Sequence, residues 1–170
     1  MADFFDVIES RSSSRLFTNE PVSKEDLEKI VYAGQCAPTG MNRQETAFVV
    51  VQDPETVSLI SKANAAVMGK DMDPFYGAKT VIVVLASKTS PTYLYDGSIA
   101  VGNMLNAAHA LGLGACWIHR AKEVFESDFG KNLLKEWGLD ESYEGISNVI
   151  VGHIEKDMPV KAKTSKVLWK

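Results

Sequence analysis

The order of apolar and polar residues along the chain predicts helices that alternate with short, strongly apolar strands. Strands are expected where β-branched residues form continuous runs, and helices where apolar residues recur every three or four positions. We expect four strands, over residues 48–51, 80–87, 115–118 and 146–154. Helices are expected over residues 3–10, 24–37, 55–67, 93–111 and, as a pair broken at Gly130, 123–137.

Local signals set the ends of several of these elements. Ser23 with Asp26 three residues later is a variant of the capping box that begins a helix, and Pro38 ends that helix. The chain shows no internal repeat and no linker, so we expect residues 1–170 to form one domain. Strands separated by helices favour an α/β or α+β fold around a central sheet.

Two familiar phosphate-binding motifs are missing from this pattern. No G-x-G-x-x-G follows the strand at 80–87, and no segment of the chain matches a P-loop. A dinucleotide-binding domain of the Rossmann type is therefore disfavoured.

Composition narrows the class of protein. The 170 residues include 18 Lys and Arg against 22 Asp and Glu, which gives a net charge of −4 and a pI near 5.4. Such a chain has no electrostatic footprint for nucleic acid, although a local basic pocket for one anion is compatible with it. Hydrophobic residues at 45% and charged residues at 24% are typical of a globular protein and exclude a disordered one.

Cysteine usage and the apolar runs indicate the compartment. Cys36 and Cys116 lie far apart with no Cys/His spacing, so neither a disulfide framework nor a zinc site is indicated. The first residues lack the features of a signal peptide, and the longest apolar run, residues 81–86, is far shorter than the ~20 residues that span a bilayer. We expect a cytoplasmic protein with no membrane partner.

The polar segment Arg11-Ser12-Ser13-Ser14-Arg15 is the first candidate site. Its two guanidinium groups can donate paired hydrogen bonds to a phosphate, and its hydroxyls add neutral donors. The alternative is a solvated helix end, because short Arg/Ser clusters are common on protein surfaces.

The basic tail likewise has two interpretations. Lys161 and Lys163 can add positive charge to an anion site, or they can belong to a solvated C-terminus.

Residues 38–44 form an amide-rich turn directly before a buried strand. Asn42 and Gln44 offer donors and acceptors that can bond the edge of a heterocycle. Turn formation alone explains Pro38, Gly40 and Asn42 equally well, so both interpretations stay open.

Residues 112–120 lead through a strand to polar residues at its end. Ligands often bind at strand ends in α/β sheets, where backbone N–H groups are free. His119 is an acid or a surface residue, whereas Cys116 and Trp117 most simply fill the core. The chain has no G-x-S-x-G motif and no metal-ligand spacing among its three histidines, so catalysis by protein nucleophiles or metals has no support.

Four motifs occur in fixed order along the chain. They are R-x-S-x-R after the first helix, A-P-T-G-x-N-x-Q before the first strand, A-H-A-L-G-L-G-x-C-W-I at the third strand, and V-G-H-I before the basic tail. In this order the chain resembles the nitroreductase family of FMN-dependent oxidoreductases in its short-chain form, from about Phe5 to Lys163.

The resemblance implies an α+β fold with a mixed central sheet and an intertwined homodimer that holds two FMN molecules at its interface. Arg11, Ser13 and Arg15 match the family's N-terminal motif, whose arginines contact the phosphate and the pyrimidine edge of the flavin. Ser12 stands where many members carry a second Arg.

Three further segments are matched to FMN contacts by the resemblance. Pro38, Thr39 and Asn42 match a segment that reaches the cofactor from the other subunit. The backbone of a third segment lies beside flavin N5, and it corresponds to Trp117, Ile118, His119 and Arg120. In the tail, Lys163 is the first choice for the phosphate contact and Lys161 the second.

The resemblance also implies a mechanism. Flavin N5 takes a hydride from NAD(P)H and passes reducing equivalents to a small acceptor, such as a nitroaromatic or a quinone, in a ping-pong cycle. The protein supplies no essential acid or base in this scheme. One alternative is a sibling flavin chemistry such as dehalogenation or azoline oxidation, with residues 63–76 in the lid. Another is a non-catalytic FMN-binding or sensor module.

Overall fold

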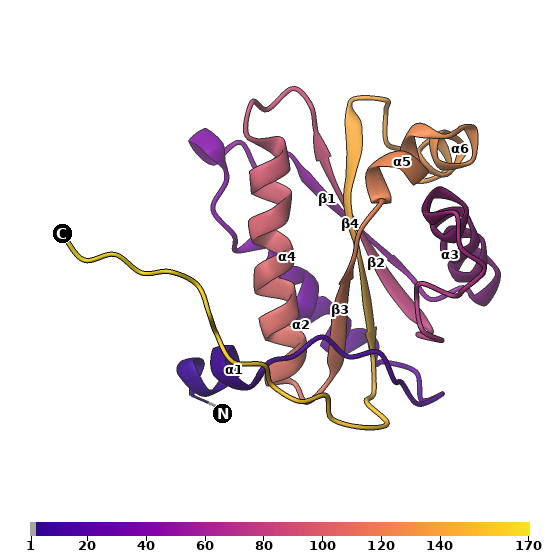
Figure 1. The fold of residues 1–170 in the computed structure, drawn as a ribbon. Helices are drawn as coiled ribbons and strands as arrows, with labels where there is room; N and C mark the ends of the chain where they lie inside the picture. The colour runs from indigo at the N-terminus through magenta and orange to yellow at the C-terminus, as the bar shows by residue number, and fades with distance from the viewer. Residues whose placement is uncertain (1–2) are drawn as a thin grey trace.

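A four-stranded sheet forms the middle layer of the molecule, whose computed structural model describes residues 3–170 (Figure 1). The strands are β1 (Thr46–Val51), β2 (Thr80–Ser87), β3 (Gly114–Ile118) and β4 (Tyr143–Gly152). They are arranged in the order β1-β2-β4-β3, and all three pairings are antiparallel.

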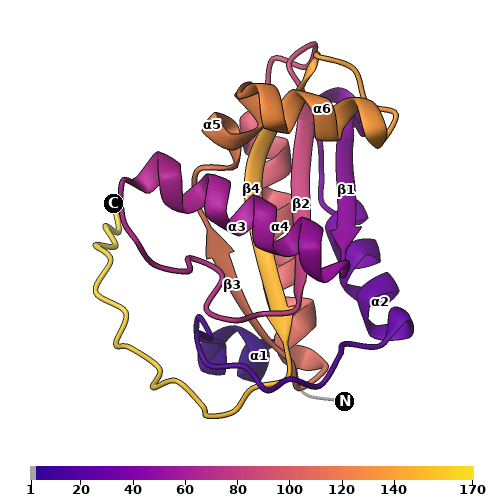
Figure 2. The same cartoon turned by 90° about the vertical axis from the view of Figure 1, so that its right-hand side faces the viewer.

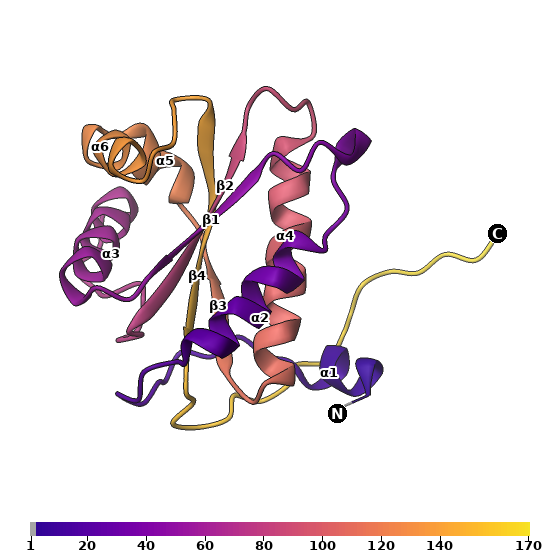
Figure 3. The same ribbon diagram turned by 180° about the vertical axis from the view of Figure 1, so that it is seen from behind.

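Helices cover both faces of this sheet. One face carries α2 (Lys24–Gln35) and α4 (Tyr93–Ala110), which lie to the right of the edge-on sheet in Figure 3. The opposite face, which is turned to the viewer in Figure 2, carries α3 (Pro54–Met68), α5 (Ala121–Glu126) and α6 (Asp128–Glu136). A short helix, α1 (Phe4–Ser10), lies at one end of α4, and a 3₁₀ turn, η1 (Gly40–Asn42), precedes β1.

Strand β2 is the centre of the core, since all eight of its residues are buried. Alternate residues point to opposite faces, as the strand geometry requires. Val81, Val83 and Leu85 join the apolar cluster under α3, α5 and α6. Ile82 and Val84 join the cluster under α2 and α4. Continuous apolar runs of this kind are typical of a strand buried on both faces.

The α+β fold is the expected one, and the structure adds how its strands are ordered. The expected sheet was mixed, yet every pairing among residues 3–170 is antiparallel. The crossover through α4 does place β2 and β3 in the same direction, but β4 inserts between them and pairs with both. The helical connection therefore leads to a strand that is not a direct neighbour, which the chain order alone does not reveal.

The predicted break between the last two helices lies at a different residue. The helices are separated at Ser127, whose hydroxyl accepts a hydrogen bond from the Gly130 N–H (3.2 Å) and caps α6. Gly130 lies inside α6, where a Cβ atom would lie 2.2 Å from the Val124 carbonyl oxygen. This glycine therefore allows two helices to approach closely and does not end one.

Other predicted signals are confirmed. Ser23 Oγ accepts a hydrogen bond from the Asp26 N–H and caps α2. The helix expected from residue 55 begins one residue earlier, at Pro54, and the structure adds its cap, the Asp53 side chain. None of the helices described between residues 3 and 170 has the length and apolar character needed to cross a bilayer.

Candidate functional site

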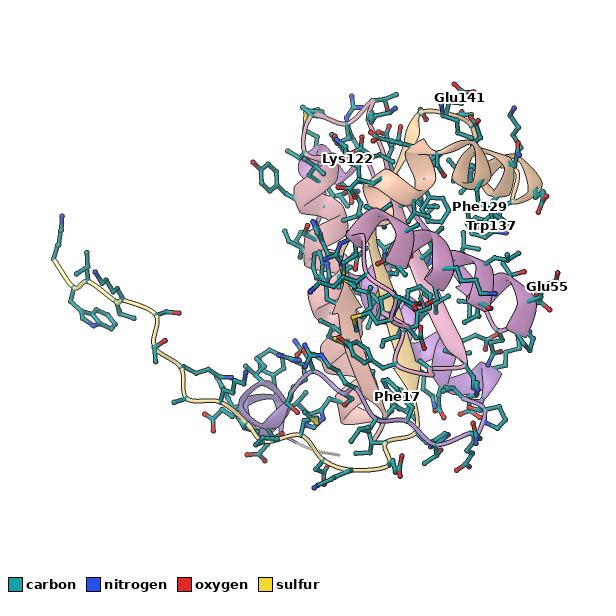
Figure 4. The ribbon with its side chains drawn as sticks, turned by 45° about the vertical axis from the view of Figure 1, so that its right-hand side comes forward. Phe17, Glu55, Lys122, Phe129, Trp137 and Glu141 are labelled. Atoms are coloured by element: carbon teal, nitrogen blue, oxygen red, sulfur yellow. The ribbon has the colours of Figure 1, made fainter. Side chains whose placement is uncertain are left out.

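The N-terminal segment after α1 lies along the edge of the sheet. Ser14 N–H donates to the Ala115 carbonyl oxygen (3.1 Å), and Thr18 N–H donates to that of His153 (2.9 Å). In Figure 4, Phe17 lies near the lower end of the sheet and Phe129 near the upper end. The segment therefore runs from the beginning of β3 to the residues that follow β4.

Two glycines make this close approach possible. Gly114 and Gly152 face each other in the β3–β4 ladder. A Cβ atom on Gly114 would lie 2.7 Å from Ser14 Cβ, and one on Gly152 would lie 2.8 Å from the Phe17 ring. The G-L-G and V-G-H-I motifs thus create a recess in the sheet that accepts residues 14–17.

One cavity of about 310 Å³ lies between this segment and the C-terminal tail. Ser12 Oγ donates to the Met158 carbonyl oxygen (3.1 Å), which holds the tail beside the segment. The cavity brings together six residues singled out in the sequence: Arg11, Ser12, Ser13, Arg15, Lys161 and Lys163.

The charges in this cavity are of one sign. Within residues 3–170, no carboxylate forms an ion pair with Arg11, Arg15, Lys161 or Lys163. Arg15 lies over the ring of Tyr76, with its guanidinium carbon 5.7 Å from the ring centroid. Four cations and the Ser13 hydroxyl around one cavity form a site for a polyanionic group such as a phosphate.

The end of β3 presents its backbone. The Trp117 side chain packs against the cluster under α2 and α4, and the Ile118 side chain is buried in the opposite cluster. His119 is exposed, and Arg120 adopts a φ of +75°, which is uncommon for a residue other than glycine. The strand leads from the basic segment to this turn. Ala115 accepts the hydrogen bond from Ser14, and His119 follows it by four residues, or about 13 Å along an extended strand.

The segment 38–44 does not line the basic cavity. It is held by the carboxylate of Asp96, a contact that the sequence analysis did not predict. Asp96 in α4 is buried, and its Oδ1 atom accepts a hydrogen bond from the Gly40 N–H (3.0 Å). Its Oδ2 atom accepts from the hydroxyls of Thr92 (3.0 Å) and Ser90 (3.3 Å). A Cβ atom on Gly40 would lie 2.1 Å from Thr92 Oγ1, so this approach requires glycine.

The conformation of this loop is unusual. Met41, Asn42 and Gln44 have φ values of +52°, +54° and +55°, which cost energy in residues other than glycine. Gln44 Nε2 donates to Asn42 Oδ1 (2.9 Å), and the Gln44 N–H donates to Thr39 Oγ1 (3.0 Å). The two amides expected to bond a heterocycle thus bond each other within this chain.

The two candidate regions lie at opposite ends of α4. Ser10 Oγ and His109 Nε2 lie 2.8 Å apart, so the end of α1 contacts the last turn of α4, whereas Asp96 holds Gly40 near its first turn (Figure 1). His109 follows Asp96 by thirteen positions in the helix, or about 20 Å along its axis. A single chain therefore does not bring Pro38, Thr39 and Asn42 to the basic cavity.

The predicted lid region corresponds to three different kinds of structure. Residues 63–68 are the last turns of α3. Phe75 is only 1% exposed and belongs to the core under α3, so its expected place in a lid was wrong. Tyr76 contacts Arg15 at the cavity, and Met72 remains exposed. The neighbouring aromatic residues Phe75 and Tyr76 therefore have different roles: Phe75 packs in the core, and Tyr76 contacts Arg15 at the cavity.

A second buried carboxylate, Glu144 in β4, has a structural environment. It accepts a hydrogen bond from Tyr93 Oη (3.0 Å) and lies 3.4 Å from Lys122 Nζ. Desolvation, together with the hydrogen bond to Glu144, raises the pKa of Tyr93, and the negative charge of Glu144 raises the pKa of Lys122. This group joins α4 and α5 to β4 and is separate from the basic cavity.

Comparisons with known proteins agree with this geometry. Residues 8–153 match the sequence profile of the Nitroreductase family. The chain is 35% identical over 123 residues to a protein of Archaeoglobus fulgidus provisionally named an NADH dehydrogenase/NAD(P)H nitroreductase, an alignment that spans 69% of this chain and 68% of that one.

Two solved structures have the same fold over almost their whole length. A nitroreductase with bound FMN from Desulfitobacterium hafniense gives a TM-score of 0.89 at 28% identity, covering 100% of this chain and 99% of that one. An FMN-dependent nitroreductase from Clostridium difficile gives 0.86 at 25% identity, covering 98% of each chain. The chain belongs to the nitroreductase family.

Proposed function

We propose that the chain is an FMN-dependent oxidoreductase that transfers reducing equivalents from NAD(P)H to a small acceptor such as a nitroaromatic or a quinone. The observation that carries this proposal is the cavity of about 310 Å³ in which Arg11, Arg15, Lys161 and Lys163 converge without a carboxylate partner among residues 3–170. Family membership and the FMN-bound structural neighbours support it. FMN held there supplies hydride chemistry at N5, in a ping-pong cycle between donor and acceptor.

The donor set of the cavity fits the phosphate and the pyrimidine edge of FMN. Arg11 and Arg15 offer paired N–H donors, and the Ser13 hydroxyl adds a neutral donor beside them. Lys163, with Lys161 second, approaches from the tail as a compact charge. The arginines also place positive charge near the ring, where it stabilises a reduced, anionic flavin.

The turn after β3 is the proposed contact with the ring itself. The side chains of Trp117 and Ile118 are in the core, so this segment acts through the backbone of His119 and Arg120. None of these roles requires a side chain that donates or accepts a proton.

We propose further that residues 1–170 form one domain that works as an intertwined homodimer. The site needs Pro38, Thr39 and Asn42 near the cavity, and within one chain they lie at the far end of α4. Large apolar side chains are exposed on α1, on α4 and on the tail that leaves the body of the molecule (Figure 1), including Phe4, Phe5, Leu94, Tyr95, Leu168 and Trp169. A partner chain that covers these surfaces also carries its own loop 38–44 to the cavity.

An absorption spectrum of the purified protein, followed by anaerobic addition of NADH or NADPH, tests the function. We expect flavin bands that bleach on addition and return when a quinone or nitroarene is supplied. Product identification by chromatography distinguishes this reaction from a sibling flavin chemistry. Bound flavin that NAD(P)H does not reduce contradicts the oxidoreductase and favours a binding module, and failure to take up FMN contradicts the whole proposal.

A further inference from the structure

Asn64, in α3, is a buried polar residue in an apolar environment. Its exposure is 0%, and it lies among residues of α3 that pack against the sheet. Its Nδ2 atom donates to the His119 carbonyl oxygen at 2.7 Å, which joins α3 to the turn after β3. Its Oδ1 atom has no hydrogen-bond partner among residues 3–170. An asparagine that leaves one buried atom unpaired is unfavourable for packing alone, so its bond to His119 is the feature that explains it.

This bond sets the direction of one peptide group. The carbonyl oxygen of His119 and the N–H of Arg120 belong to the same trans peptide and point in opposite directions. Because the oxygen points toward α3, the Arg120 N–H points away from the core. No acceptor among residues 3–170 takes a hydrogen bond from that N–H. It is therefore free to donate to a ligand.

The turn needs an external constraint. Arg120 has a φ of +75°, and as the N-cap of α5 it contributes no side-chain hydrogen bond. The connection between β3 and α5 consists of His119 and Arg120 alone, and the side chain of His119 is exposed. The bond from Asn64 is a contact from the rigid core to this connection.

We propose that Asn64 is a positioning residue that aims the Arg120 N–H at the flavin ring. This inference rests on the proposed function, in which the backbone after β3 lies beside N5. An N–H fixed at that edge would donate to the N5 lone pair of the oxidised ring, and this bond is weakened once N5 carries the transferred hydrogen. Asn64 therefore lowers the reduction potential and helps to orient N5 toward the donor, without contacting the cofactor. Asn64 thus acts through the peptide between His119 and Arg120.

Asn148 in β4 supplies a matched control. It is also 0% exposed and lies opposite Ile118 in the β3–β4 ladder. Neither of its amide atoms has a hydrogen-bond partner among residues 3–170, and the turn receives no bond from it. Asn64→Leu and Asn148→Leu therefore make the same chemical change in the same core, but only the first removes a bond to His119.

The test measures the midpoint potential of bound FMN in the full-length holoprotein and in both variants. For Asn64→Leu we expect about a tenfold loss of preference for oxidised over reduced FMN, which is an upward shift of about 30 mV for a two-electron couple. The limiting rate of flavin reduction by NADH should fall about tenfold, below the 10²–10³ typical of deleting a donor outright, while KM changes little. Asn148→Leu should change neither value.

A second readout needs no flavin. The first hydrogen bond of α5 runs from the Val124 N–H to the Arg120 carbonyl oxygen (3.2 Å). Amide hydrogen exchange at Val124 in the FMN-free protein should quicken in Asn64→Leu and not in Asn148→Leu. If Asn64→Leu does not fold, Asn64→Ser, whose hydroxyl is too short to reach His119, carries the same predictions.

The outcomes distinguish a failure of this inference from a failure of the proposed function on which it rests. A wild-type protein that binds no FMN overturns both. Flavin-loaded wild type and Asn64→Leu with equal potentials overturn the positioning role alone, as do equal shifts in the Asn64 and Asn148 variants.

Discussion

The basic cavity and the loop 38–44 both contain residues that we propose to contact FMN, but they are held in place by different means. The segment after α1 is fixed by backbone hydrogen bonds to β3 and to the residues after β4, over a recess created by Gly114 and Gly152. The loop is fixed by one buried carboxylate, Asp96, and contains three strained residues. The cavity is built within one chain, whereas the loop lies at the far end of α4 from it. The comparison supports the proposal that the site is divided between two subunits.

The largest expected effect comes from removing the anchor of the loop. Asp96→Ala leaves the Gly40 N–H and the hydroxyls of Thr92 and Ser90 without their acceptor, so we expect a loss of about 3 kcal/mol of unfolding free energy. Urea denaturation measures this, with Asp71→Ala, an exposed acid, as the control. If the two variants are equally stable, Asp96 does not hold the loop.

Removing one guanidinium from the cavity should have the next largest effect. Arg11→Ala loses charge-assisted hydrogen bonds worth about 2 kcal/mol, so the Kd for FMN should rise about 30-fold and the flavin potential should fall. Fluorescence titration and a potential measurement check both. Arg11→Lys should recover the charge but not the paired donors and should lie between the two. Unchanged FMN affinity in Arg11→Ala would remove Arg11 from the site.

The tail should give the smallest effect. Lys163 is exposed, and salt screens an exposed charge, so Lys163→Ala should weaken FMN binding by about threefold at low salt and less at high salt. Lys166→Ala provides the matched control, because Lys166 does not line the cavity. Equal effects of the two substitutions would mean that the tail contributes only general positive charge.

Much of this fold follows from local signals in the sequence. The caps at Ser23 and Asp53 and the continuous apolar run of β2 set their elements within a few residues. The R-x-S-x-R motif and the tail lysines were expected at one anion site, and the structure brings them to one cavity.

The remainder depends on contacts that span the chain. Asp96 follows a helical pattern in which a buried acid and a solvated one look alike, and its partner Gly40 is 56 residues away. Asn64 and His119 are 55 residues apart, so nothing local indicates their bond. The position of β4 between β2 and β3 likewise arises from tertiary packing, which is also what makes Gly130 a contact residue.

Subunit complementation tests most directly whether the two regions form one site between two chains. Arg11→Ala impairs the cavity and Asn42→Ala impairs the loop, so a heterodimer of the two contains one intact site and one doubly impaired site. Random reassembly makes about half of the dimers heterodimers, so about a quarter of all sites should bind FMN with wild-type affinity. A mixture that binds FMN no better than either variant alone would contradict the divided site.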